Sequence, residues 1–200
     1  ITLEDKRAGQ EKKDSFCYEG GIRSFVEDLN ASREQLLFPQ PLYFEEADGD
    51  TMCEVAIQYN ESYNEVIYSY ANNVNTIDGG THVEGLRLAL TKVINDYGKK
   101  AGLMKESDKL SGEDVREGIT AVVSVKLVNA QFESQTKDKL NNSFIRSFVS
   151  QCVTEHLSAF MEENPSAAKE LVMRCLTAQK ARDAARAARD LTRRKGVLEN

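Results

Sequence analysis

The sequence predicts an α+β domain in which helices cover a mostly antiparallel sheet and one long helix forms the C-terminal end. Two observations predict this class. Strand-like apolar runs, interrupted by amphipathic helices, fill the first two-thirds of the chain, and nothing breaks helical periodicity after Pro165. A composition of 40% hydrophobic and 29% charged residues fits a packed domain, and 200 residues can bury a core without disulfides or metals.

The first expected elements are two strands, at residues 1–7 and 12–18, joined by a polar turn. A glycine pair then opens a short helix, whose apolar face is formed by Ile22, Phe25, Val26 and Leu29. The proline-containing segment 38–41 prevents this helix from continuing.

The middle of the chain is expected to add three strands, at residues 42–46, 52–59 and 65–70. Alternate residues of the second strand face one way: Cys53, Val55, Ile57 and Tyr59. The short segment 60–64 favours a hairpin between the last two of these strands.

A Gly/Asn/Asp loop at residues 74–81 precedes the next helix, which covers residues 81–100. Thr81 is expected to be the N-cap of that helix, with Glu84 as its capping-box partner. By the same logic, Ser111 begins another short helix.

The remaining third is expected to be mainly helical. A Val-rich buried strand at 119–127 leads into a polar loop at 128–142, and a helix follows at 144–163. The Asn-Pro pair at 164–165 is typical of an N-cap and first helical position. The last helix then covers residues 165–195, a rod of about 45 Å.

Several classes of protein are disfavoured by what the sequence lacks. The four cysteines are too far apart to form a short-spaced metal pair, and they are expected to be reduced, as in a cytosolic protein. No apolar run is long enough for a membrane helix, and a start without Met or a signal-peptide core indicates a fragment. P-loop and dinucleotide fingerprints are absent, and His82 and His156 are expected to be structural or exposed.

Charge is unevenly distributed along the chain. The formal net charge is −6, but residues 169–195 hold nine basic and three acidic residues, so this segment carries +6 and the rest carries −12. On a helical wheel one stripe, about 60° wide, holds Arg182, Arg186, Arg189 and Arg193, and alanines fill the opposite side. The stripe is either a solvated helix face or, because arginine suits phosphates, a sequence-independent contact to a DNA backbone.

The polar loop at 128–142 is long for a compact domain, and such loops are usually functional or disordered. Lys137 and Lys139 bracket an aspartate, so composition alone favours a solvated loop. A Gly-rich phosphate cradle is absent from the sequence, which therefore contains no nucleotide site of its own.

Five segments occur here in the order and spacing found in the ATPase subunits of type II topoisomerases. They are Tyr18-Glu19-Gly20-Gly21-Ile22, Asp78-Gly79-Gly80-Thr81-His82, Glu113-Asp114-Val115-Arg116-Glu117-Gly118, Gln135-Thr136-Lys137 and Ala181-Arg182-Asp183-Ala184-Ala185-Arg186, the last running on to Lys195. The resemblance covers essentially the whole chain. The bacterial gyrase B family is most similar, and the topoisomerase IV B subunits are the alternative.

The resemblance implies a transducer domain with the fold of ribosomal protein S5 domain 2, including a left-handed crossover. Residues 1–18 would be the closing strands of a GHKL-type ATPase domain, 19–164 the transducer core, and 165–200 an Arg/Ala-rich helix leading to a Toprim domain. The absent ATPase domain would hold ATP and Mg²⁺, so the fragment is expected to hold no cofactor or metal and to be inactive alone.

The resemblance also assigns roles. Gln135 and Lys137 would contact the γ-phosphate of ATP, with Lys137 acting as both catalyst and sensor. Arg87 and the arginine stripe would line the cavity that holds DNA, without sequence specificity. The implied function is coupling of ATP hydrolysis to DNA strand passage and supercoiling, in a cytoplasmic enzyme that is a dimer and contains the gyrase A protein.

Two other hypotheses stay open: a non-enzymatic DNA-binding or scaffold module that uses the rod alone, and the middle domain of another GHKL ATPase. The sequence also departs from the family beside the loop. Val128 and Ala130 stand where prolines are common, Asn141 replaces a usual Gly, and Phe144 replaces a usual Glu. These changes bear on the conformation of the loop rather than on Gln135 or Lys137.

Overall fold

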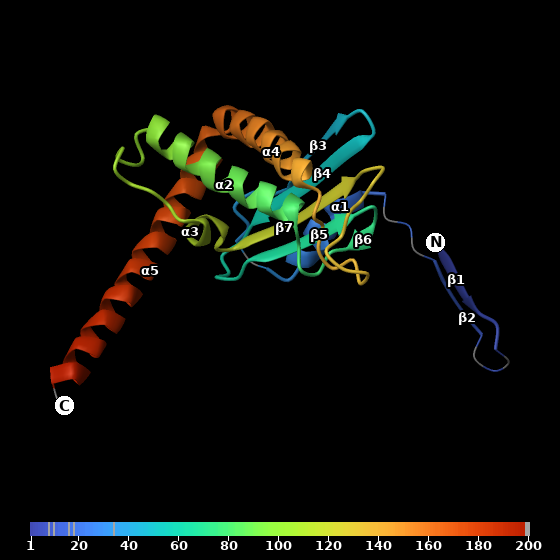
Figure 1. The fold of residues 1–200 in the computed structure, drawn as a ribbon, viewed down its shortest axis with the longest axis horizontal. Helices are drawn as coiled ribbons and strands as arrows, with labels where there is room; N and C mark the ends of the chain where they lie inside the picture. The colour runs from blue at the N-terminus through green and yellow to red at the C-terminus, as the bar shows by residue number, and fades with distance from the viewer. Residues whose placement is uncertain (8, 10, 16, 18, 34, 199–200) are drawn as a thin grey trace.

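The computed structural model describes residues 1–7, 9, 11–15, 17, 19–33 and 35–198. Its main body is a five-stranded mixed sheet with helices on both faces, and one long helix projects from it (Figure 1). The strand order is β3-β4-β7-β5-β6, with bounds Leu42–Asp48 for β3, Thr51–Tyr59 for β4, Val66–Ala71 for β5, Val74–Asn75 for β6 and Ile119–Lys126 for β7. The expected α+β class is confirmed.

β7 lies at the centre of this sheet, antiparallel to β4 and parallel to β5. The expected hairpin between β4 and β5 is therefore wrong, because β7 separates the two strands. Seven of the eight residues of β7 are buried, and a strand that is apolar on both faces is best accommodated between two neighbours. The loop expected at 74–81 also begins two residues late, because residues 74–75 pair with β5 as β6.

The parallel pair β5 and β7 needs a crossover connection, which α2 (Thr81–Lys100) and α3 (Gly112–Arg116) supply. The left-handed sense of this crossover, and the likeness to ribosomal protein S5 domain 2, stay predictions from the resemblance.

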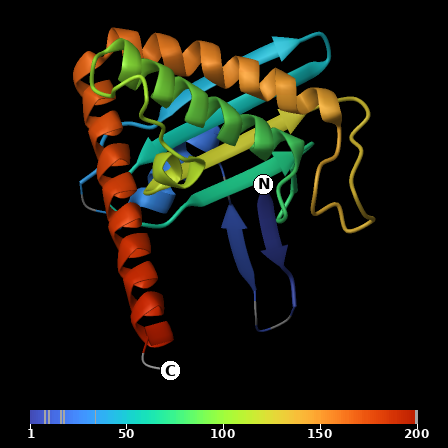
Figure 2. The ribbon, with the colours of Figure 1, turned by 60° about the vertical axis from the view of Figure 1, so that its left-hand side comes forward.

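One face of the sheet is covered by α2 and α4 (Ser143–Glu163), which lie side by side (Figure 2). Gly85 permits their close approach, since a Cβ at that position would lie 2.5 Å from the carbonyl oxygen of Arg146. The core beneath them contains the expected β4 face, and its members are Cys53, Val55, Ile57, Tyr59, Leu86, Leu90, Val149 and Val153. Periodicity in the sequence therefore identified the buried face of β4 correctly.

The opposite face of the sheet is only partly covered. There α1 (Gly21–Asn30) packs Val26 against Ala56 of β4 and Val122 of β7. The helix and the apolar face expected for it, from Ile22 to Leu29, are confirmed.

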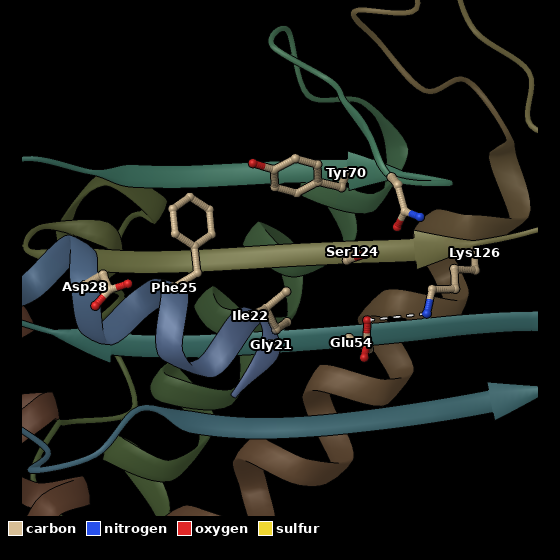
Figure 3. A pocket seen from close by; sticks show the side chains of 9 residues that line it. Gly21, Ile22, Phe25, Asp28, Glu54, Tyr70, Ser124 and Lys126 are labelled. Atoms are coloured by element: carbon tan, nitrogen blue, oxygen red, sulfur yellow. Dashed lines mark ion pairs between the residues drawn. The ribbon is translucent and has the colours of Figure 1, made fainter. Parts of the chain in front are cut away.

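Beside α1 lies a groove of about 610 Å³ (Figure 3). Ile22, Phe25 and Tyr70 supply its apolar walls, and its charged groups are Asp28, Glu54 and Lys126. The lysine lies 4.0 Å from the Glu54 carboxylate. Two carboxylates facing one lysine do not suit a triphosphate, so this groove is no substitute for the nucleotide pocket that the sequence lacks.

The start of α2 differs from expectation. Gly80 rather than Thr81 is the N-cap, and no side chain caps this helix. The buried Thr81 hydroxyl has no hydrogen-bond partner among the described residues, and Glu84 instead lies 3.5 Å from Arg146. The capping box expected at Thr81 is therefore wrong, because the Thr81 amide donates to the Leu140 carbonyl at 3.0 Å. The backbone of the polar loop, rather than a side chain, therefore accepts a hydrogen bond from the first residue of α2.

The two later helix starts agree better with the sequence. Ser111 caps α3 in a reciprocal capping box with Asp114. α5 runs over Pro165–Leu198 and begins as expected at the Asn-Pro pair, and the Asn164 carbonyl accepts the first bond of the new helix, from Ala168, at 2.9 Å. The Asn164 side chain, however, donates to Phe160 at the end of α4.

The N-terminal strands, β1 (Thr2–Asp5) and β2 (Lys12–Ser15), pair with each other in a hairpin that stands apart from the main sheet (Figure 1). The strand expected at 12–18 is confirmed as far as residue 15, and positions 16 and 18 lie outside the described residues. Assignment of residues 1–18 to a preceding domain stays a prediction.

α5 has a packed half and a projecting half (Figures 1 and 2). Its buried residues are Ala168, Leu171, Val172, Cys175 and Ala178. Residues 183–193 are all exposed. In the described part of the chain, no helix combines the length and apolar character that a membrane crossing requires.

The cysteines agree with the expectation of reduced, mostly buried thiols. All four are free, with Cys53, Cys152 and Cys175 buried and Cys17 exposed. The described residues also contain no group of three or more His, Cys, Asp or Glu side chains placed to hold a metal ion.

Candidate functional site

The polar loop is closed at its base and exposed at its tip. The Asn142 side chain accepts from Gln131 N–H at 2.7 Å and donates to the Asn129 carbonyl at 2.9 Å, while Glu133 N–H donates to the Lys139 carbonyl at 3.0 Å. The tip residues Gln135, Thr136 and Lys137 are exposed. Figure 2 shows this loop, just before α4, reaching past the ends of α2 and α4. The arrangement resembles a compact surface loop rather than a disordered one.

Lys137 is the tip residue with the most unusual geometry. Its φ of 61° is in the left-handed region, which a lysine rarely adopts, and its N–H donates to the Ser134 carbonyl at 3.1 Å. Its Nζ lies 5.9 Å from the centroid of the Phe132 ring. Within the described part of the chain this ammonium has no ion-pair partner, whereas Lys139 pairs with Glu133 at 2.9 Å. Lys137 is thus available to an external anion.

The loop is bonded directly to the start of α2. Asp78 N–H donates to the Asp138 carbonyl at 2.9 Å, and Leu140 N–H donates to the Gly79 carbonyl at 3.1 Å. Gly80 forms a parallel bridge with Leu140, and a Cβ on Gly80 would lie 2.2 Å from the Leu140 carbonyl oxygen. Gly80 also has a φ of 130°, so both the contact and the backbone conformation require glycine. A displacement of the loop therefore acts on the first turn of α2.

His82 lies fully buried in that first turn. Its Nε2 lies 3.0 Å from the Thr76 hydroxyl, and its Nδ1 has no hydrogen-bond partner among the described residues. Burial lowers the pKa of His82 to about 4, so the ring is neutral at physiological pH. The structural role expected for His82 agrees with this position. His156, by contrast, is stacked on Phe44 at the surface, with 4.9 Å between the ring centroids.

Arg87 lies on the exposed side of α2 and is engaged within the chain. Its Nη2 lies 2.6 Å from Glu65, whose carboxylate also accepts from Arg116 Nε at 2.9 Å. Burial would raise the pKa of Glu65, but hydrogen bonds from Arg116 and Arg87 hold that pKa below its usual value. Half of the Arg87 side chain remains exposed, so a polyanion could still reach it, in competition with Glu65.

The arginine stripe divides into one engaged residue and three free ones. Arg182 forms two hydrogen bonds with the buried Asp114 carboxylate, at 2.7 and 3.1 Å. Arg186, Arg189 and Arg193 are exposed and have no ion pair in the described part of the chain. Arg182 therefore differs from the other three arginines of the stripe, because its guanidinium holds α5 to α3, and contact of the stripe with DNA stays a prediction.

The alanine side of α5 is not covered by another element among the described residues. Small residues allow close approach of a second helix or a sheet, but Ala181, Ala184, Ala185, Ala187 and Ala188 are exposed. Beyond Arg182, the described part of the rod touches nothing else in this chain that would cover it.

Sequence reasoning missed two acidic residues that organise the site. Glu65 was assigned only to a strand, although it joins Arg87 to Arg116. Asp114 was named only within a family motif at the start of a short helix, although it holds Arg182. Asp114 and Arg182 are 68 positions apart. A single sequence carries no signal that pairs them, since their contact depends on the path of α5.

Comparison with solved structures defines the class of protein. The 43K ATPase domain of Thermus thermophilus gyrase B, solved with an aminocoumarin, matches with a TM-score of 0.81 and 40% identity, over 95% of this chain and 50% of that one. The topoisomerase IV ATP-binding domain of Francisella tularensis matches with a TM-score of 0.74 and 27% identity, over 86% of this chain and 46% of that one. The fold is therefore that of part of the ATPase region of type II topoisomerases.

The model of the DNA gyrase B family matches residues 21–191, and the chain belongs to that family. The DNA gyrase B protein of Clostridium acetobutylicum is 52% identical over 202 residues, which span all of this chain and 31% of that protein. The chain thus covers about a third of the length of such curated relatives. The expected membership of the gyrase B family is confirmed.

Proposed function

We propose that this chain is the transducer part of a DNA gyrase B protein, which couples ATP binding and hydrolysis in a neighbouring domain to strand passage and supercoiling of DNA. Family membership supports this proposal, and so does the match to only half of the Thermus thermophilus ATPase domain. The observation that carries it is an exposed loop that presents Lys137, which has no ion pair among the described residues. Through Asp138 and Leu140, the backbone of this loop is hydrogen-bonded to the residues at the start of α2.

Lys137 is suited to the terminal phosphate of ATP. ATP supplies a phosphoryl group on which negative charge must be stabilised during transfer. A compact ammonium at the tip of a loop stabilises that charge, and the Gln135 amide adds a further hydrogen-bond donor. When the phosphate leaves, the contact that held the loop outward is lost. The same lysine therefore acts as catalyst and sensor.

The rest of the chain converts a change in the position of the loop into a movement of α2 and α5. The loop lies at one end of α2 and the packed half of α5 at the other (Figures 1 and 2). A Cβ on Gly98, near the C-terminal end of α2, would lie 3.3 Å from Val172 of α5, so the two helices are in direct contact. Under this proposal residues 19–164 form the transducer core, and residues 165–200 lead to a Toprim domain.

Several properties of the complete enzyme belong to the same proposal. DNA would be held without sequence specificity, by Arg186, Arg189 and Arg193 and less directly by Arg87. The expected protein partners are the ATPase and Toprim domains of the same chain, the gyrase A protein and a second copy of the gyrase B protein. Mg²⁺ would be bound by the ATPase domain, as the resemblance to this family implies.

Replacement of Lys137 by alanine tests the proposal in the complete gyrase B protein, combined with the gyrase A protein. We expect ATP turnover to fall by about 10²- to 10³-fold, because one preorganised charge that faces the transferred group is removed. Nucleotide affinity should change much less. The measurement is steady-state ATP hydrolysis together with binding of a non-hydrolysable analogue.

Lys139→Ala is the matched control, because Lys139 lies two positions away and is already paired with Glu133. Its ATP turnover should stay near that of the wild type. Unchanged turnover in Lys137→Ala, or an equal loss in both variants, would refute the sensing role.

A further inference from the structure

The projecting half of α5 leaves the main body at Arg182. Residues 183–193 are exposed, and Arg182 makes the last hydrogen bonds between the described part of the rod and the main body. The rod from there to Leu198 is roughly 24 Å long. A tilt of about 20° at its base would displace its end by about 8 Å. The group that fixes the base therefore determines where the end of the rod lies.

The group that holds Arg182 is built into the main body. The Asp114 side chain is only 1% exposed, and its Oδ2 accepts from both the backbone N–H and the hydroxyl of Ser111, at 2.7 Å each. Burial would raise the pKa of Asp114, but hydrogen bonds from Arg182 and Ser111 hold that pKa below its usual value. A buried carboxylate held by four hydrogen bonds is a rigid anchor with fixed geometry.

A second tie lies one turn earlier along the rod. The Gln179 amide donates to the Lys109 carbonyl at 2.9 Å, so α5 is bonded twice to the segment that carries α3. That segment is itself fixed to α2, because the Asn95 side chain accepts from Leu110 N–H at 2.9 Å and donates to the Leu110 carbonyl at 3.2 Å.

The other end of α3 returns to α2 as well. Arg116, its last residue, shares the Glu65 carboxylate with Arg87 of α2. Tyr59 of β4 donates to the Val115 carbonyl at 2.9 Å, which fixes α3 to the central sheet. A rigid displacement of α2 must therefore move α3, and α3 holds the rod through Asp114.

We propose that the Asp114–Arg182 ion pair is the joint through which α2 and α3 set the direction of the projecting rod, and that Arg182 is a positioning residue rather than a DNA contact. This inference rests on the proposed coupling function. It assigns to α3 the role of joining α2, whose first turn is bonded to the polar loop, to the projecting half of α5. Arg186, Arg189 and Arg193, which lie beyond this ion pair, then move with the projecting half of α5 as one rigid unit.

The test uses the complete gyrase B protein with the gyrase A protein, and it removes each partner of the Asp114–Arg182 ion pair in turn. Arg182→Gln removes the guanidinium, and Asp114→Asn removes the carboxylate without removing a positive charge. We expect ATP turnover within about two-fold of wild type, but at least about five-fold fewer supercoils per ATP hydrolysed, in both variants. Arg182→Lys should recover part of this ratio, because an ammonium can still bond one carboxylate oxygen.

Lys180→Gln is the matched control, since it removes one positive charge from the same helix at an exposed residue two positions before Arg182, and no ion pair holds Lys180 among the described residues. It should leave the ratio of supercoils to ATP near the wild-type value. If Arg182→Gln lowers the ratio and Asp114→Asn does not, Arg182 acts on DNA and the joint is refuted. An unchanged ratio in both variants also refutes it.

A DNA-free measurement keeps the inference testable if either variant is poorly active. Spin labels at Lys92 of α2 and Ala187 of the rod, both exposed, report their separation by pulsed electron resonance. The distance distribution should be narrow in the wild type and broad in Arg182→Gln. An unaltered distribution contradicts the joint. Failure of the Lys137→Ala test would refute coupling to ATP, yet this distance would still report whether Arg182 sets the direction of the rod.

Discussion

Single side chains show both the reach and the limit of sequence reasoning. Lys137 was identified through a motif, but its φ of 61° and its lack of an ion pair among the described residues depend on how the loop closes around it. Arg182 was placed correctly on one stripe with three other arginines, yet its partner Asp114 comes from a segment far away in sequence. Local spacing predicts which residues share a face, and only the fold determines what that face meets.

The buried imidazole of His82 provides a prediction at this scale. Its pKa of about 4 lies below the usual value of 6.5, so below pH 6.5 the unfolded chain binds the proton more readily. The contribution of His82 to stability is complete above pH 6.5 and is lost as the pH falls toward 4, amounting to roughly 3 kcal/mol. Urea unfolding at several pH values measures this loss.

His82→Gln is the informative comparison, because the variant cannot be protonated at this position. The difference in unfolding free energy between wild type and variant should shrink as the pH falls from 7 to 4. Asp114 and Glu65 are present in both proteins, so their own acid-dependent losses cancel in that difference. Parallel stability curves for the two proteins would show that His82 is not the titrating group.

Secondary-structure elements were predicted well where they depend on local pattern. The apolar face of α1, the cap at Ser111 and the start of α5 all follow from residues a few positions apart. The hairpin expected between β4 and β5 is wrong, because β7 pairs between these two strands. β7 lies about fifty residues later in the chain, and local turn signals do not encode a pairing at that distance. The capping box expected at Thr81 is wrong for the same reason. The Thr81 N–H donates to the carbonyl of Leu140, which comes from a distant loop, instead of to the Glu84 side chain.

The projecting half of α5 is the element on which DNA binding should depend. Replacement of Arg186, Arg189 and Arg193 by glutamine should weaken DNA binding to a similar extent for all sequences. It should also reduce the slope of log K against log salt by about three units, because three phosphate contacts are lost. Filter binding of short duplexes to the complete gyrase B protein, over a range of salt concentrations, measures both effects.

Lys100, Lys105 and Lys109 provide a control with the same loss of formal charge, located at the C-terminal end of α2 and in the segment that follows it rather than on the rod. Their replacement by glutamine should leave the salt slope near the wild-type value. If the two triple variants lose affinity and slope equally, net charge rather than the position of the rod explains binding.

The whole molecule places an exposed polar loop and a basic rod at opposite ends of one helix (Figure 2). The sequence predicted both features and the family, because motifs and charge asymmetry are linear properties. It did not predict the connection between them. That connection runs through Glu65, Asn95 and Asp114, three polar residues that tie α2 to α3 and α3 to α5.

Amide hydrogen exchange in the complete gyrase B protein, with and without a non-hydrolysable ATP analogue, tests the central claim most directly. The account predicts that the analogue slows exchange at residues 134–138 and in the first turn of α2, and that Lys137→Ala abolishes both effects. Protection confined to the nucleotide-binding domain, with these two segments unchanged, would contradict the claim that the loop contacts the nucleotide and passes its state to α2.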